Sequence, residues 1–313
     1  MKRNAKMPFV TLRNRNQKND LTMSKNFLLI AFAFVSTLGA HLNAADKIKV
    51  LILDGPQVAH KYKRTTPVLK QILENASMFE VDHSRSSKEA CEDGSYKPEF
   101  DKYDVIVMNE GANAPVWPVK TQKDFTKFMS EGGGMVTVHA GNNCWPDWEE
   151  YNKMTAVGGW GGRNEKSGPY LYMNDEGEVI RDESKGKGGA HGPQHEFEIV
   201  VRDAEHPIMK GLPQTFMHGP DELYDKLRGP AENVTILATA FSSKKKRGTG
   251  RHEPVFMVIN YEEGRVFHSI LGHHVEQIQE GSFVTTFLRG TEWAATGEVT
   301  IPIPEDFPNQ KFE

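Results

Sequence analysis

The sequence predicts an α/β fold in which helices flank a mainly parallel, doubly wound sheet of the flavodoxin-like kind. Short apolar runs without polar alternation recur in the first half of the chain, for example at residues 49–53 and 105–108. Such runs are typical of central parallel strands that are buried on both faces. Segments with apolar residues at helical spacing lie between the runs, and this alternation of strand and helix predicts parallel pairing.

The predicted elements of the first half follow one another closely. The strand at 49–53 is followed by a helix over residues 65–75. Thr65 or Thr66 can cap this helix, because a hydroxyl accepts a hydrogen bond from a free backbone N–H of the first turn. The other elements are expected in this order: strands at 79–82 and 105–108, a helix at 124–130, and a strand at 135–138.

The second half is less regular. Residues 158–189 are rich in Gly, Lys, Asn and Ser and are interpreted as a long insertion or lid. Further elements are expected beyond it: strands at 196–201, 235–240, 255–259 and 265–270, and a closing helix at 283–295. No internal repeat or domain boundary interrupts residues 46–302, so a single domain is predicted there, followed by a surface tail at 303–313.

Residues 1–45 are interpreted as a leader and signal peptide. An apolar run at 27–40 follows a lysine and precedes small residues that end at Ala45. A positive start, a short apolar core and a small-residue end are typical of secretory signals. The run is shorter than the roughly 20 residues that span a bilayer. We therefore expect an exported protein, periplasmic or extracellular, whose mature form begins near Ala45 and has no membrane span.

Charge and cysteine content narrow the function classes. The 313 residues carry a formal net charge of −4, so the composition does not favour a nucleic-acid partner. The two cysteines are Cys91 and Cys144, and export would permit a disulfide between them. The sequence leaves that pairing open.

The carboxyl edge of the predicted sheet is where ligands are expected. Loops that begin at Asp54, Asn109 and His139 follow three of the strands and share this edge. His139 comes directly after the strand at 135–138, a position that favours a general base or a metal ligand. Cys144 lies five residues further on and is interpreted as a packed residue, with a nucleophilic role as the minor alternative.

Four groups of residues carry a resemblance to a known family. They are Gly132 to Gly141, His191 to His195 with Glu205-His206-Pro207, Asp221-Glu222-Leu223-Tyr224, and Gly264 to His268 with Leu271-Gly272-His273. In this order the chain resembles the ThuA-like (trehalose utilisation) family, which is similar in fold to class I glutamine amidotransferases. The resemblance implies a small-molecule carbohydrate as partner, of the trehalose or keto-sugar type. In the amidotransferase fold a cysteine nucleophile occupies the turn where this chain has His139, so glutamine amidotransferase chemistry is not expected.

Histidines and one carboxylate are the candidate catalytic groups. His139 and Glu222 are predicted to transfer protons, because the apolar neighbours of Glu222 can raise a carboxyl pKa. A divalent metal such as zinc is a candidate cofactor, with His60, His139, His195 and His273 as its ligands. His191 and His195 stand four residues apart, but Gly192-Pro193 between them makes a turn, so the spacing is weak evidence for a metal.

Five residues are candidates for substrate binding. The rings and polar groups expected near the carboxyl edge are those of His60, Asn142, Trp145, Arg163 and His218. Aromatic faces can stack on sugar rings, and amide or guanidinium groups can bind hydroxyls. The favoured function is a sugar-directed hydrolase or lyase. A non-catalytic carbohydrate-binding module and a cysteine hydrolase that uses Cys144 remain as alternatives.

Overall fold

The computed structural model describes residues 47–56 and 59–312, which fall in one compact unit that starts at Asp46. The predicted leader at 1–45 lies outside the described residues. Within the described part of the chain, no helix combines the length and the apolar character that crossing a membrane requires.

Five neighbouring strands of the sheet are parallel, and parallel pairing was predicted for the four that lie in the first half of the chain. In spatial order they are β2 (Phe79–Arg85), β1 (Ile48–Asp54), β3 (Val105–Asn109), β4 (Gly134–Val138) and β13 (Gly264–Ser269). All side chains of β3 and β4 are buried, which explains why both strands are apolar without alternation. The mixed α/β class with a large central sheet is confirmed.

Antiparallel strands extend this sheet on the far side of β13. They are β12 (His252–Tyr261), β11 (Val234–Phe241), β8 (His195–Val201) and β9 (Thr215–Asp221). The hairpin of β5 (Tyr170–Met173) and β6 (Val179–Asp182) pairs with β12, and β7 (Ala190–His191) pairs with β10 (Tyr224–Asp225) in a separate ribbon. The segment at 158–189 therefore contains a hairpin, where the sequence predicted an irregular insertion. Its strands are four residues long, too short for periodicity to separate them from loop.

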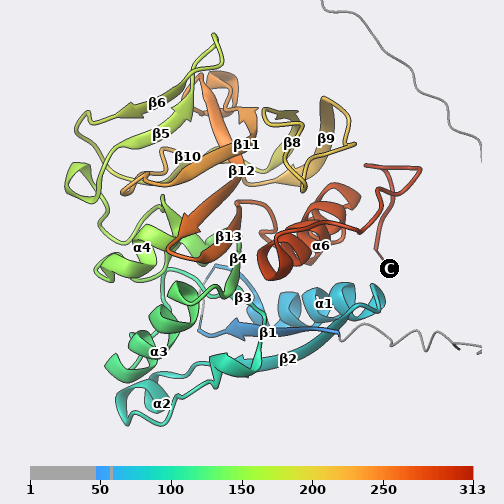
Figure 1. The fold of residues 1–313 in the computed structure, drawn as a ribbon. Coiled ribbons are helices and arrows are strands. Elements are labelled where there is room, and N and C mark those ends of the chain that lie inside the picture. Colours follow the sequence, from blue (N-terminus) through green and yellow to red (C-terminus); the bar gives the residue numbers. More distant parts are fainter. Residues whose placement is uncertain (1–46, 57–58, 313) are drawn as a thin grey trace, which may run out of the picture. The chain divides into compact units, whose positions relative to one another are not determined.

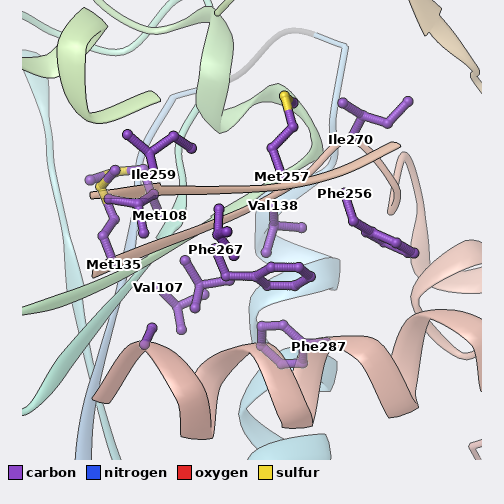
Figure 2. Close-up of a cluster of buried hydrophobic side chains, with 14 of the residues drawn as sticks. Val107, Met108, Met135, Val138, Phe256, Met257, Ile259, Phe267, Ile270 and Phe287 are labelled. Atoms are coloured by element: carbon purple, nitrogen blue, oxygen red, sulfur yellow. The ribbon is translucent and has the colours of Figure 1, made fainter. Parts of the chain in front are cut away.

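The helices cover the parallel strands (Figure 1). They are α1 (Tyr62–Asn75), α2 (Lys88–Glu92), α3 (Val119–Ser130), α4 (Glu149–Thr155), α5 (Val275–Ile278) and α6 (Gly281–Thr296). α1 packs on β1 and β2, and α6 packs on β3, β4 and β13. Figure 2 shows Phe287 of α6 facing Phe267 of β13 in the buried core. The expected tail is not free, because Phe307 and Phe312 pack against this core.

The strand order places a crevice at the carboxyl edge of the parallel strands. The chain passes from β1 to β2 on one side, then returns to β3 and β4 on the other side. The loops on either side of such a reversal diverge and leave room for a ligand. The loops after β1, β3, β4 and β13 all leave the sheet at this edge, since the five strands are parallel.

Candidate functional site

Four side chains from separate parts of the chain meet at the carboxyl edge. His60 follows β1, His139 follows β4, Glu222 follows β9 and His273 follows β13. Each offers a nitrogen or oxygen atom, and these atoms all lie within 4.8 Å of one another. The expectation that His60, His139 and His273 share one rim agrees with this geometry. We call these four residues the histidine–glutamate cluster.

His139 occupies a strained turn with a fixed ring orientation. Its φ is +46°, a left-handed conformation that is uncommon for residues other than glycine and often marks functional sites. Its Nδ1 lies 2.6 Å from the carbonyl oxygen of Ile270. A carbonyl only accepts, so Nδ1 carries the proton and Nε2 keeps a lone pair. That lone pair faces the cluster, with Nε2 3.2 Å from Nδ1 of His273.

His60 is held as a neutral imidazole. Its ring meets those of His139 and His273 edge to face, at centroid distances of 4.8 Å and 4.9 Å. Burial, followed by the nearby His139 and His273, lowers the pKa of His60 to about 2. A neutral imidazole has the free lone pair that a metal ion requires.

Glu222 is more acidic than the sequence analysis predicted. Burial raises the pKa of this carboxyl, but the neighbouring His139 and His273 outweigh burial and bring the pKa below its usual range. One oxygen, Oε2, lies 3.1 Å from Nδ1 of His273 and 3.6 Å from Nε2 of His139. The apolar neighbours in sequence therefore do not decide the pKa. Glu222 is ionised, which suits a metal ligand better than a general acid.

Asp221 fixes the backbone around the cluster. Its carboxylate accepts hydrogen bonds from the backbone N–H groups of Glu222, Gly272 and His273, at 2.7, 2.8 and 3.3 Å. Gly272 has a φ of +108°, which residues with a Cβ rarely adopt, so the turn that delivers His273 favours glycine. A buried carboxylate that binds both segments holds Glu222 and His273 in register.

His218 and His195 do not join the cluster, contrary to their predicted roles. The His218 side chain is fully buried behind Asp221, with Nε2 3.1 Å from its carboxylate and Nδ1 2.7 Å from Oγ of Ser282. It can orient Asp221 but cannot touch a substrate. His195 starts β8, and its Nδ1 lies 2.8 Å from the carbonyl oxygen of Pro193.

Asn142, Trp145 and Arg163 support the loop after β4 and do not line the cavity at the cluster. Asn142 is buried, and its Nδ2 donates to Nε2 of His268. Arg163 is 2% exposed, and its guanidinium donates to the carbonyl oxygens of Asn143, Cys144 and Gly159 and to Oδ1 of Asn152. Arginine is drawn into the interior here because it satisfies several loop acceptors at once. This arrangement does not support the predicted substrate contacts of Asn142 and Arg163.

Cys144 is unsuited to nucleophilic chemistry. It is fully buried, its thiol donates to the carbonyl oxygen of Gly111, and burial raises its pKa well above the usual range. A thiolate is therefore disfavoured. Cys91 and Cys144 are both free, so they form no disulfide with each other. The structure therefore does not support a cysteine hydrolase that uses Cys144 as its nucleophile.

Three residues of the cavity were not assigned to the site from sequence. The cavity beside the cluster measures about 180 Å³ and is also lined by His191, Trp160 and Tyr224. The Tyr224 hydroxyl lies 3.4 Å from Nε2 of His60, and Nε2 of His191 lies 3.7 Å from Oε2 of Glu222. Tyr224 could have been assigned to the site from sequence, because it belongs to the motif Asp221-Glu222-Leu223-Tyr224. The pairing of β7 with β10 brings His191 opposite Tyr224, and this pairing had no sequence signal.

Comparison with known proteins places the chain in a family. The family model for ThuA, described as "Trehalose utilisation", matches residues 49–294. The chain belongs to the ThuA family. A solved structure described as a ThuA-like protein from Parabacteroides merdae ATCC 43184 is 42% identical, with a TM-score of 0.80; the match covers 85% of this chain and 98% of that one.

A second ThuA-like structure shares the fold at lower identity. The protein from Bacteroides uniformis ATCC 8492 is 19% identical, with a TM-score of 0.56, over 83% of this chain and 98% of that one. A comparison with curated proteins gives no match. Family membership links this ThuA protein to trehalose utilisation but does not specify its reaction.

Proposed function

We propose that this ThuA protein binds a divalent metal such as zinc at the histidine–glutamate cluster and acts on a carbohydrate as a hydrolase or lyase. The observation that carries the proposal is the convergence of three imidazoles and one carboxylate from four distant segments. Imidazole nitrogen and carboxylate oxygen are common zinc ligands, and catalytic zinc sites often combine them. The carbohydrate class is supported by the family description.

The donor set fits a metal in its protonation as well as its geometry. His60 is neutral, Glu222 is ionised and the tautomer of His139 exposes Nε2. The bond from Nδ1 of His139 to a carbonyl is the outer contact that orients many metal-binding histidines. A bound zinc ion would polarise a substrate oxygen and lower the pKa of water to about 7.

His191 is the best placed group for proton transfer in this proposal. The side chain is about one third exposed and lines the cavity, and its Nε2 faces Glu222. His139 and Glu222 then serve as ligands. Without a metal, the same two residues would form the proton-transfer pair that the sequence analysis predicted.

Zinc titration tests the proposal directly. The protein is freed of metal with a chelator and titrated with zinc by calorimetry. We expect one equivalent to bind and the melting temperature to rise, since a ligand at 100 times its Kd adds about 2.7 kcal/mol to the stability of the folded state. Absence of stoichiometric binding would refute the metal site and return His139 and Glu222 to metal-free catalysis.

A carbohydrate-binding module is the second candidate function. It would bind sugars at the same edge without converting them. Product analysis of the zinc-loaded protein with trehalose, maltose, cellobiose and sucrose separates the two, because only the enzyme changes the sugar.

Export is proposed from the sequence of the leader. We expect the mature protein recovered from the cell envelope to begin near Ala45, because the small residues there fit signal-peptidase cleavage. Mass spectrometry of the intact protein gives the start directly. A product that retains Met1 in the cytoplasm would contradict export.

A further inference from the structure

We propose that a groove beside the cluster binds one hexose ring of a disaccharide whose other ring lies at the histidine–glutamate cluster. This inference rests on the proposed function and adds a second binding site, which would hold the sugar ring that does not lie at the cluster. The groove is lined by the loop after β3, the loop after β4 and the first turn of α4, and measures about 360 Å³. We call it the tryptophan groove, after Trp145 and Trp148.

The tryptophan groove adjoins the cavity at the cluster. Ala112 lines both. The two loops that form the walls are tied together, because the Cys144 thiol donates to the carbonyl oxygen of Gly111 and the Trp145 indole N–H donates to that of Pro115. The same pair of loops therefore shapes both spaces, and the proposed disaccharide would extend from one into the other.

The size of the cluster cavity indicates that the substrate extends beyond it. Pockets for small organic ligands commonly measure about 300–1,000 Å³. The cavity of about 180 Å³ falls below that range, and the tryptophan groove of about 360 Å³ falls within it. Among the cavities described, the groove is also the one that shares a lining residue with the cluster cavity.

The chemistry of the tryptophan groove matches a sugar ring. Trp145, Trp148 and Val116 give it apolar surface, and Val116 is 72% exposed. Asp147 and Gln122 add polar groups to its lining. A pyranose has C–H groups that stack on aromatic faces and hydroxyls at its rim that bind carboxylates and amides. A lining that combines aromatic and apolar surface with a few polar groups suits such a ligand.

The backbone at Trp145 supplies an independent observation. Its φ is +38°, a rare conformation for so bulky a residue. Two further positions of this kind are Trp160, which lines the adjoining cavity, and His139 of the cluster. Strain of this kind persists where the surrounding structure enforces it, and it concentrates at ligand sites.

Binding of disaccharides to wild type and two groove variants tests the inference. The zinc-loaded protein is titrated by calorimetry with glucose, trehalose, maltose, cellobiose and sucrose. We expect at least one disaccharide to bind about 10-fold more tightly than glucose. Val116→Arg places a long side chain into the groove and should remove this advantage while leaving zinc binding and glucose binding unchanged. Trp148→Leu should reduce the tighter binding of the disaccharide relative to glucose, because it removes an aromatic face.

The matched control is Val119→Arg. Val119 is 69% exposed, similar to Val116, but lies outside the tryptophan groove. It should behave as wild type in every titration. If no disaccharide binds more tightly than glucose, or if Val116→Arg keeps the advantage, the inference is wrong. Zinc binding is measured in the same samples, so failure of the metal site is seen separately from failure of the groove.

Discussion

His139→Ala is expected to weaken zinc binding by more than about 100-fold and to lower turnover by about 10²–10⁴-fold. The variant removes a ligand from the cluster, and even outer-shell partners of metal ligands typically contribute 10–100-fold in affinity. The loss of rate follows because a bound metal would supply several kcal/mol of charge stabilisation, and a loss of 10²–10⁴-fold corresponds to about 3–5 kcal/mol of barrier. Zinc affinity is measured by competition with a chromophoric chelator, and turnover on the sugar that product analysis identifies.

His195→Ala is the matched control for this prediction. His195 is also a histidine, but it lies outside the cluster. It should keep wild-type zinc affinity and turnover. If His139→Ala instead binds zinc normally but loses most of its stability, the histidine is structural and is not a zinc ligand. Equal losses in the two variants would likewise contradict the assigned ligand set.

Arg163→Ala is expected to destabilise the protein by about 3 kcal/mol or more. The variant leaves three loop carbonyls and the Asn152 side chain without their donor, and each unsatisfied buried acceptor costs roughly 1–3 kcal/mol. Urea unfolding followed by circular dichroism measures the change as a lower midpoint at an unchanged m-value. Arg163→Lys should recover only part of the loss, because an ammonium cannot reach acceptors arranged around a planar guanidinium.

Arg64→Ala is the control, since Arg64 is exposed on α1. A surface substitution of this kind usually changes stability by less than about 0.5 kcal/mol. If Arg163→Ala is as stable as wild type but binds sugar weakly, the contact with substrate that the sequence suggested would be correct. The hydrogen bonds described above would then be of little energetic importance.

The parallel half of the fold was predictable because burial on both faces leaves a direct sequence signal. β1, β3 and β4 appear as continuous apolar runs, and the helices between them have apolar residues at helical spacing. The β5–β6 hairpin and the ribbon of β7 with β10 were missed. Their strands are two to four residues long, and long-range pairing stabilises them more than local periodicity does.

The candidate site was only partly predictable. His60, His139 and His273 were assigned from their places at strand ends, because parallel strands bring their carboxyl ends to one edge. Residue type alone could not separate Glu222 of the cluster and the cavity residue His191 from His195 and His218, which lie outside both. Asn142 and Arg163 have polar side chains beside His139 and Trp160 in sequence, but their donors turn inward to loop acceptors.

The α/β class, the family and the edge of the sheet at which the histidines gather could all be inferred from the sequence. They follow from local periodicity, from short motifs and from the geometry of parallel strands, which depend on residues close together in the chain. Three properties depend on the tertiary structure: the set of polar side chains that face the cavity, the low pKa of Glu222 and the tautomer of His139. Those properties depend on contacts such as His139 with Ile270 and Glu222 with His273, which join residues about 50 to 130 positions apart. Electrostatic and hydrogen-bond energies act over a few ångströms in space, so they are fixed only when the chain is folded.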